Sequence, residues 1–371
     1  MISDVLIIGG GIIGLSIARE LHKGRIGRIT IVDQGKAGRE ASYAAAGMLA
    51  PNAESDEIDA FYRLCAGSNE MYGQFAAELF AETGIDIELD RSGTLFTAFT
   101  DADSEELDHR VANMDRAGLA VHRLSAAETI AAEPHISSAV RESLFFEDNW
   151  QVENRKTVAA LIEYAKRNDI TIVENECIER LIEAGGKVLG GSSGKSRFYA
   201  KTTIIATGAW TDLITINGTA LPFSIKPIRG QMIVFHPPRR LFDKVVYSPS
   251  AYLVPRKDGR VLAGATVEDV GFDKEVSIAS KRYLAEAAAE ISPELIKAEI
   301  VDAWCGLRPR GTDELPVIGP LPGFEGVFVA TGHYRNGILL APITAGIIAD
   351  AAAGRDNIYA ETFGPQRFVR F

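Results

Sequence analysis

The feature that most constrains the fold is a strand–loop–helix pattern at the start of the chain. Residues 4–8 form a short apolar run that ends in the glycine-rich loop 9–14. Helical spacing follows over 12–21, and a second apolar run over 28–33 completes a unit of about 30 residues. Short continuous apolar runs are typical of buried parallel strands, so the pattern predicts a βαβ unit.

The loop Gly9-Gly10-Gly11-Ile12-Ile13-Gly14 has the spacing GxGxxG. In this spacing Gly9 permits a tight turn, Gly11 lets the backbone approach a pyrophosphate, and Gly14 lets the helix pack closely on the strand. Chance glycine spacing is common in a chain with 35 glycines, so the strand before the loop and the helix after it carry the inference. A tight turn without a ligand is the competing interpretation.

An acidic residue stands at the end of the second strand. Asp33 lies about 20 residues after the loop, where an acid accepts hydrogen bonds from a ribose hydroxyl. An acid at this place favours a free ribose over a 2′-phosphate. The loop and the acid together predict a bound dinucleotide, and they do not decide between FAD and NAD.

The rest of the chain alternates between two kinds of structure. Segments of parallel βα type lie at the start, the middle and the end, and antiparallel strand-rich segments are inserted twice between them, with a hairpin turn at Lys257-Asp258-Gly259. This alternation predicts two interleaved domains rather than two in tandem. Spacing predicts helices over 60–83, 104–117, 126–132, 154–167, 280–291 and 337–352, and strands within 94–100, 171–174, 202–207, 225–236, 251–269, 299–308 and 326–331.

Composition narrows the functions that such a chain can have. The net charge is −11 and Lys and Arg do not cluster, so neither a nucleic acid nor an anionic membrane surface is expected as a partner. Three cysteines, Cys65, Cys177 and Cys305, show no metal-binding spacing, which predicts no metal site and fits a reducing compartment. The uncharged stretches 5–18 and 337–349 are too short for a membrane helix, and the N-terminus lacks the basic region of a secretory signal. We therefore expect a soluble, cytoplasmic protein.

Two further segments favour a flavin. Small residues crowd 38–51, as expected where a backbone passes close to a flat cofactor, although the buried start of an alanine-rich helix is an alternative. Residues 331–342 leave a strand and enter an apolar helix. A helix N-terminus directed at the pyrimidine edge of a flavin would stabilise the negative charge that develops there on reduction.

Four blocks of sequence resemble the D-amino-acid oxidase superfamily of flavoproteins. They are GREASYAAAGMLAP, AYLVPRKDGRVLAGAT, WCGLRPRGTDELPVIG and GHYRNGILLAP, and the resemblance extends from Asp4 to the helix after Pro342. The blocks are most similar to the glycine oxidases of bacterial thiamine biosynthesis, whereas monomeric sarcosine oxidases and D-amino-acid dehydrogenases are more distant. The resemblance implies bound FAD, a small amino acid or amine as substrate, dioxygen as electron acceptor, and a homotetramer.

Together with the alternation of element types, the resemblance predicts an α/β protein, α+β overall. A Rossmann-type FAD-binding domain is expected from residues 1–82, 148–213 and 306–371. It is interleaved with an antiparallel-sheet substrate-binding domain from residues 83–147 and 214–305.

The resemblance also implies where each part of FAD would lie. The diphosphate would meet 12–13, the ribose 33–34, and the phosphate and isoalloxazine 41–48, while Ile178 would approach the adenine and 333–339 would wrap the flavin ring. His333 is expected to contribute its backbone rather than a catalytic imidazole. The implied FAD-binding residues are Gly9, Gly11, Ile12, Ile13, Gly14, Asp33, Gln34, Ala41, Ser42, Ala46, Gly47, Met48, Ile178, Gly208, Gly332, His333, Tyr334, Arg335, Asn336, Gly337, Ile338 and Leu339.

Sarcosine-oxidase relatives tether their flavin through a cysteine. Cys305 precedes Gly306-Leu307-Arg308, and the sequence context of those covalent relatives is not found here. Non-covalent FAD is therefore expected.

Three residues are the candidate catalytic residues. Arg308 would bind the substrate carboxylate through a bidentate fork, and Tyr252 would add its hydroxyl. Arg335 would meet the amino group and the flavin edge. A substrate held in this way would react as a neutral amine without a side-chain base, and would give an imine that water converts to an oxo acid and ammonia, with hydrogen peroxide from dioxygen.

The predicted pocket wall departs from the glycine-oxidase pattern at two positions. Ser250 stands where a histidine is expected, and Val267 where a methionine is expected. Both changes remove bulk, which predicts room for sarcosine or small D-amino acids. Three competing functions remain. They are a nicotinamide dehydrogenase, an FAD-dependent D-amino-acid dehydrogenase or sarcosine-oxidase-like enzyme that passes electrons to another acceptor, and a flavoprotein that binds without catalysis.

Overall fold

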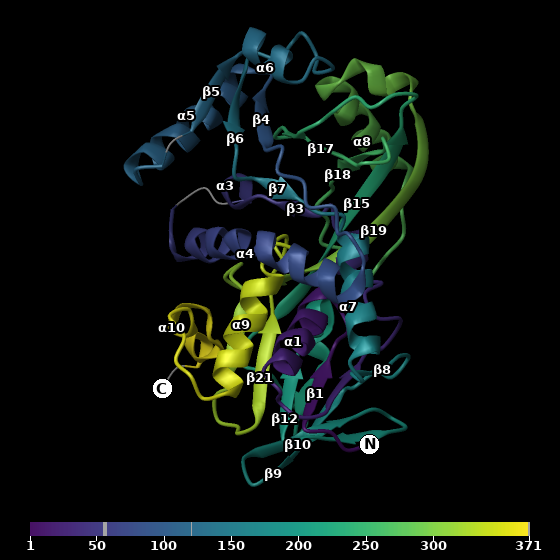
Figure 1. Cartoon of the computed structure of the whole chain (residues 1–371), viewed down its shortest axis with the longest axis vertical. Helices are drawn as coiled ribbons and strands as arrows, with labels where there is room; N and C mark the ends of the chain where they lie inside the picture. The colour runs from purple at the N-terminus through teal and green to yellow at the C-terminus, as the bar shows by residue number, and fades with distance from the viewer. Residues whose placement is uncertain (55–57, 120, 370–371) are drawn as a thin grey trace.

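The computed structural model describes residues 1–54, 58–119 and 121–369, and its elements form two large β-sheets with helices around them (Figure 1). The first sheet has the order β20-β21-β12-β1-β2-β8, and all neighbours in it are parallel except β20 and β21. Its strands are β1 (Val5–Ile8), β2 (Ile29–Val32), β8 (Thr171–Val173), β12 (Thr202–Ile205), β20 (Val317–Pro320) and β21 (Val327–Thr331).

The two faces of this parallel sheet are covered differently. Side chains of alternate strand residues, such as Val5 and Ile7, pack against a helical layer. The others, such as Leu6 and Ile8, pack against a second, antiparallel-type sheet. The helices are α1 (Ile12–Lys23), α4 (Ala60–Thr83), α7 (Asn154–Arg167) and α9 (Ala341–Ala352). Both faces of the sheet are covered, so every residue of β1 and β2 is buried, and all of them except Thr30 are apolar. This burial explains the continuous apolar runs in the sequence.

The sheet on the second face is one that the sequence analysis did not predict. Its order is β11-β10-β9-β13-β14, and its strands are short and mostly solvent-facing on one side. Such strands give little apolar periodicity, so the sequence between 180 and 220 does not predict them. The strands are β9 (Arg180–Ala184), β10 (Lys187–Ser192), β11 (Arg197–Tyr199), β13 (Thr215–Ile216) and β14 (Thr219–Ala220).

The other large sheet has eight strands in the order β19-β15-β18-β17-β16-β4-β6-β5. Its long pair, β15 and β19, runs from the helix α8 (Ile278–Ile291) toward the parallel sheet (Figure 1). The remaining pairs are antiparallel except β16 with β4. The strands are β4 (Thr94–Ala98), β5 (His122–Ser125), β6 (Glu142–Phe146), β15 (Ile225–His236), β16 (Val245–Tyr247), β17 (Tyr252–Pro255), β18 (Val261–Gly264) and β19 (Glu299–Gly311).

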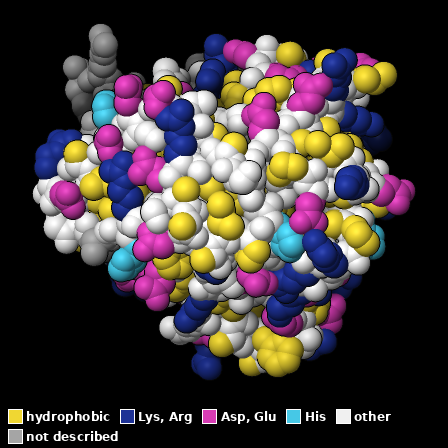
Figure 2. All heavy atoms as spheres, turned by 90° about the horizontal axis from the view of Figure 1, so that it is seen from above, with side chains coloured by type: hydrophobic (Ala, Val, Ile, Leu, Met, Phe, Trp, Pro, Cys, Tyr) yellow, Lys and Arg dark blue, Asp and Glu magenta, His cyan; other side chains and the backbone are white. Residues whose placement is uncertain are grey.

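The remaining elements complete the described chain. These are α2 (Ala41–Ala44), α3 (Pro51–Glu54), α5 (Asp101–Arg116), α6 (Ala126–Ala132), α10 (Ala360–Phe363), the strand pair β3 (Met48–Leu49) and β7 (Trp150–Gln151), and 3₁₀ turns over Gly208–Leu213, Pro293–Lys297 and Pro365–Phe368. None of the helices among the described residues combines the length and the apolar character needed to cross a membrane. On the face in Figure 2, Lys and Arg side chains are interspersed with Asp and Glu side chains.

The predicted α/β class, with parallel and antiparallel sheets from alternating stretches of chain, is confirmed. The start of the last predicted helix needs correction. This helix begins at Ala341, not at Gly337, because 333–340 forms a loop held by other contacts. The segment 251–269 forms the predicted hairpin, with β17 and β18 paired on either side of 257–259, and after β18 the chain still pairs with β15 at the bridge between Glu268 and Arg229. The boundaries of the two predicted domains stay a prediction.

Candidate active site

A cavity of about 310 Å³ lies where the two large sheets meet. Its walls come from the carboxyl ends of the parallel strands β1, β2, β12 and β21 and from β15 to β19 of the other sheet. Open α/β sheets bind ligands at the carboxyl ends of their strands. All the predicted site residues line this cavity except Gly14, Gly332 and Leu339, and their individual roles stay predictions.

The glycine loop is shaped by packing at two positions and by access at the third. A Cβ on Gly9 would overlap the carbonyl of Ala206, and one on Gly14 would overlap the carbonyl of Gly9. Gly14 therefore lies behind the wall, where it lets α1 approach β1. A Cβ on Gly11 would meet only Ser42 Oγ, at 3.3 Å, so glycine here leaves the backbone open toward the cavity.

The start of α1 suits an anion. The helix begins at Ile12 with no acid in its first turn, and its macrodipole places partial positive charge at the cavity wall. Asp33 is half-buried nearby, and its carboxylate accepts hydrogen bonds from the N–H groups of Gly10 and Gly35 at 2.7 and 2.8 Å. A carboxylate has about four acceptor positions, so capacity for a ribose hydroxyl remains. These residues fit a dinucleotide diphosphate and ribose.

The small-residue segment passes along the cavity as a wall rather than as a buried helix. The helix α2 is only four residues long and has no buried residue, which removes the alanine-rich core helix as an explanation. Gly47 has φ +78°, and a Cβ there would overlap the carbonyl of Val152. A Cβ on Gly306 would lie 2.5 Å from the Cβ of Ala44. The small side chains thus let the backbone of 41–48 sit beside the cavity.

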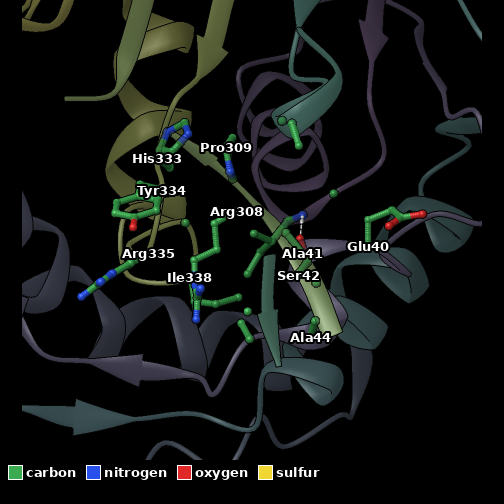
Figure 3. A pocket seen from close by; sticks show the side chains of 18 of the residues that line it. Glu40, Ala41, Ser42, Ala44, Arg308, Pro309, His333, Tyr334, Arg335 and Ile338 are labelled. Atoms are coloured by element: carbon green, nitrogen blue, oxygen red, sulfur yellow. Dashed lines mark hydrogen bonds between the residues drawn. The ribbon is translucent and has the colours of Figure 1, made fainter. Parts of the chain in front are cut away.

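The segment 333–338 closes another side of the cavity (Figure 3). His333 is only 3% exposed, its Nε2 lies 3.0 Å from Thr344 Oγ1, and burial lowers the pKa of His333 to about 3. The imidazole is therefore neutral at physiological pH, which fits the expectation that this side chain has a structural rather than a catalytic role. Helix α4 fixes the loop from behind, because Tyr72 Oη donates to the Ile338 carbonyl and Ser68 Oγ to the Leu339 carbonyl. The Leu339 side chain is buried in the core formed with the helical layer.

The side chains of Arg308 and Tyr252 line the cavity from the eight-stranded sheet. Arg308 is on β19 and Tyr252 on β17, with β15 and β18 between them. A Cβ on Gly230 of β15 would overlap the guanidinium of Arg308, and one on Gly264 of β18 would lie 2.7 Å from Tyr252 Oη. Two glycines on the intervening strands therefore make room for the two side chains, and no motif in the sequence pointed to Gly230.

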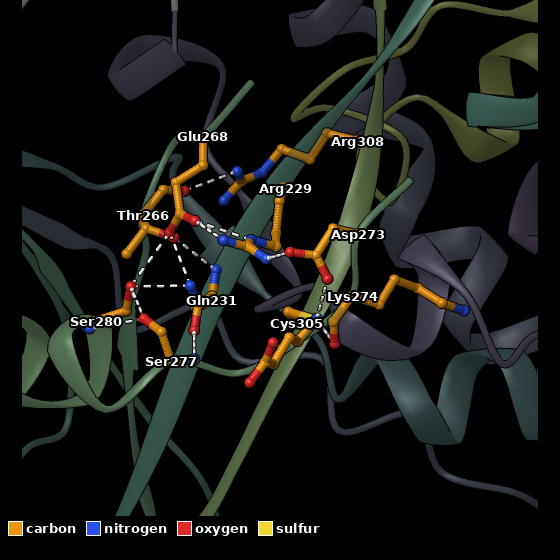
Figure 4. A network of polar contacts seen from close by, with 11 residues as sticks. Arg229, Gln231, Thr266, Glu268, Asp273, Lys274, Ser277, Ser280, Cys305 and Arg308 are labelled. Carbon is orange, nitrogen blue, oxygen red and sulfur yellow. Dashed lines mark hydrogen bonds and ion pairs between the residues drawn. The ribbon is translucent and has the colours of Figure 1, made fainter. Parts of the chain in front are cut away.

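The loop 265–277 that follows β18 is fixed to β15 by a polar network (Figure 4). Glu268 and Arg229 exchange two backbone hydrogen bonds of 2.9 Å, and the Arg229 guanidinium pairs with the carboxylates of Glu268 and Asp273. The Thr266 carbonyl in this loop accepts a 3.0 Å hydrogen bond from Arg308 Nη1. No carboxylate in the described part of the chain pairs with Arg308. Its charge is thus available to an anion in the cavity.

The structure adds an aromatic group that the sequence analysis missed. Tyr247 lines the cavity, and its ring stacks on Phe96 at 4.7 Å and on Tyr252 at 5.9 Å between centroids. The hairpin of β16 and β17 pairs the two tyrosines, and the sheet order brings Phe96 on β4 to them. Arg335 also lines the cavity, with its guanidinium carbon 5.2 Å from the ring centroid of Tyr334. Ser250 and Val267 both stand on the wall, and Val267 is half exposed at 51%.

The sequence profile of the family described as "DAO: FAD dependent oxidoreductase" matches residues 4–351. The chain belongs to this FAD-dependent oxidoreductase family. It is 32% identical over 360 residues to a glycine oxidase of Pseudomonas putida, covering 96% of both chains. A bifunctional protein ThiO/ThiG of Synechocystis is 35% identical over 376 residues, which are 99% of this chain and 54% of that protein. The crystal structure of glycine oxidase from Geobacillus kaustophilus superposes with a TM-score of 0.94 at 31% identity, covering all of both chains. The protein is thus an FAD-dependent enzyme similar to glycine oxidases.

Proposed function

We propose that this flavoenzyme oxidises a small amine that carries a carboxylate, such as glycine, sarcosine or D-alanine. The observation that carries the proposal is Arg308, a half-buried guanidinium that lines the cavity and hydrogen-bonds only to the Thr266 carbonyl among the described residues. A planar guanidinium binds a carboxylate through two parallel hydrogen bonds, and the Tyr252 hydroxyl can add a third. The relatives named glycine oxidase support the same substrate class.

The residues of the chain position the substrate rather than exchange protons with it. Arg308 and Tyr252 fix the carboxylate, which restricts the orientation of the Cα–H bond in the cavity. FAD, when bound, supplies the two-electron acceptor that the reaction needs. The lining carboxylate of Glu40 is paired with Lys274, and that of Glu176 accepts hydrogen bonds from Ser193 and Ser196.

If the substrate reacts as a neutral amine, its nitrogen lone pair assists loss of the Cα hydrogen. The reaction then requires no general base from these residues. For glycine the overall reaction consumes water and dioxygen and yields glyoxylate, ammonia and hydrogen peroxide. We propose that this activity serves thiamine thiazole synthesis in the cytoplasm, and that the enzyme is a homotetramer, on the resemblance to the glycine oxidases of that pathway.

We also propose that FAD is bound without a covalent link. A tether of the kind found in sarcosine-oxidase relatives needs a cysteine beside the isoalloxazine. Cys65 and Cys305 do not line the cavity, and the Cys305 thiol contacts the Lys274 carbonyl instead. Cys177 does line it, but next to Gln34, at the end proposed for the ribose. FAD released intact into the supernatant by acid precipitation of the protein would support this proposal, and retention on the chain would contradict it.

The test of the proposed function is a panel of amines assayed for peroxide, combined with anaerobic reduction. We expect glycine, sarcosine or D-alanine to bleach the flavin absorbance without oxygen and to release peroxide with oxygen. Bleaching without peroxide, and turnover only with an added electron acceptor, would instead indicate a D-amino-acid dehydrogenase or another enzyme with a different acceptor. Absence of bleaching by every carboxylate-bearing amine would refute the proposal.

A further inference from the structure

A buried guanidinium lies directly behind the cavity wall formed by residues 46–48. Arg256 follows β17 and is only 5% exposed. Its Nη2 donates to the Ala46 carbonyl at 2.7 Å, and its Nη1 donates to the Val152 carbonyl at 3.0 Å. Since Ala46 lines the cavity, a single peptide group separates the guanidinium from the wall.

The side-chain partners of this guanidinium are also neutral. The amide oxygens of Gln151 and Asn154 each accept a hydrogen bond of 3.2 Å. Burial lowers the pKa of Arg256 to about 10, so the group stays charged at neutral pH. Glu153 and Glu88 act on it only through longer-range attraction, which Arg260 and Arg155 oppose. No carboxylate within the described ranges forms a hydrogen bond with it.

A charge buried in this way is costly unless something compensates it. A ring system that lies against the 46–48 wall is the candidate for this compensation, because it would be within reach of the positive field of Arg256. In a poorly hydrated interior such a field is weakly screened. Charge near an isoalloxazine is one of the means by which a protein sets the electronic properties of a flavin.

We propose that Arg256 is a positioning residue that also tunes bound FAD: it fixes the 46–48 wall, and its charge stabilises the negative charge that the isoalloxazine gains on reduction. The proposal rests on the proposed placement of the isoalloxazine against this wall. It assigns the driving force for amine oxidation in part to a residue that never touches the substrate.

The neighbour Gln151 offers a way to neutralise this charge without removing Arg256. Gln151 Nε2 donates to Asp90 Oδ2 at 3.2 Å, so the two residues form an amide–carboxylate pair. The double substitution Asp90→Asn/Gln151→Glu exchanges the amide and the carboxylate between the two positions. The net charge and nearly all atoms are kept, while a carboxylate is brought against Arg256. The single substitution Asp90→Asn is the matched control.

The readout is the midpoint potential of bound FAD, measured by equilibration with a dye of known potential, together with FAD affinity from flavin fluorescence. We expect the equilibrium constant for two-electron reduction to fall at least tenfold in the double variant, a shift of about 30 mV to more negative potential. Asp90→Asn should shift the potential by less than a third of that. A double variant that binds FAD and keeps the wild-type potential overturns the proposal.

A second comparison applies if the double variant does not take up FAD. Arg256→Lys keeps a charge at the site and Arg256→Gln removes it, so the lysine variant should have the more positive potential, and equal potentials overturn the proposal. No amine is present in these measurements. Their failure would therefore leave the proposed substrate class standing, and an enzyme that fails to oxidise amines would leave the potentials interpretable.

Discussion

Replacing Arg308 by alanine is the most direct test of the substrate site. The Arg308 guanidinium lines the cavity, and among the described residues it bonds to a carbonyl and to no carboxylate. The substitution removes this uncompensated positive charge. Hydrogen bonds between charged groups contribute about 1.5–3 kcal/mol, and a bidentate pair combines two of them. We therefore expect a loss of about 2–4 kcal/mol in transition-state stabilisation, which is roughly 30- to 900-fold in kcat/KM.

The structural cost of the same change should be small. Arg308 is half-buried and makes one hydrogen bond, to Thr266, whose loss amounts to about 0.5–1.5 kcal/mol. FAD content and melting temperature should therefore stay near wild type. Arg310→Ala is the matched control, because Arg310 is on the same strand but lies outside the cavity lining, and among the described residues its side chain makes only a long ion pair of 3.9 Å to Glu314.

The assay is steady-state peroxide release with glycine, sarcosine and D-alanine, with flavin absorbance used to measure bound FAD. Most of the loss should appear in KM, since carboxylate binding precedes the chemical step. Arg308→Lys should recover only part of the activity, because an ammonium lacks the planar fork. An Arg308→Ala enzyme within about threefold of wild type, or an equal loss in Arg310→Ala, would refute the reasoning.

Three further predictions test other parts of the site. Asp33→Ala should weaken FAD binding about ten- to a hundredfold by titration while leaving anaerobic reduction of reconstituted enzyme nearly unchanged, and an unaltered FAD affinity would exclude the ribose contact. Val267→Met should move kcat/KM preference from sarcosine or D-alanine toward glycine, by up to about fourfold per carbon, and an unmoved ranking would show that Val267 does not shape the pocket. Burial lowers the pKa of His333 from about 6.5 to about 3, so below pH 6.5 the unfolded chain binds a proton that the folded one does not. Stability from this group should therefore be complete above pH 6.5 and fall by about 1.4 kcal/mol per unit toward pH 3, and His333→Asn should reduce that slope in denaturant titrations.

Sequence reasoning succeeded where a local pattern reports directly on burial. The helices 60–83, 126–132 and 154–167 and the strand 225–236 begin and end where the structure has them. In α4 and α7 most buried residues recur every three or four positions, and Ser125 marks the start of α6 by accepting a hydrogen bond from the Glu128 N–H. The reasoning failed at the five-stranded sheet near 180–220, because short half-exposed strands produce no such period.

The sequence by itself determined the strand–loop–helix unit with its glycine-rich loop, the class of the fold and, through four resembling blocks, most of the predicted residues that line one cavity. These features depend on local spacing and on side-chain size, which a linear chain displays. Tertiary structure alone decided which strands are neighbours. Sheet order brings Phe96 against Tyr247, places Gly230 beneath Arg308, and puts the buried charge of Arg256 behind Ala46, more than two hundred residues away along the chain. No local pattern encodes these contacts, because each of them depends on how distant segments pair and pack, and that pairing is a property of the whole folded chain.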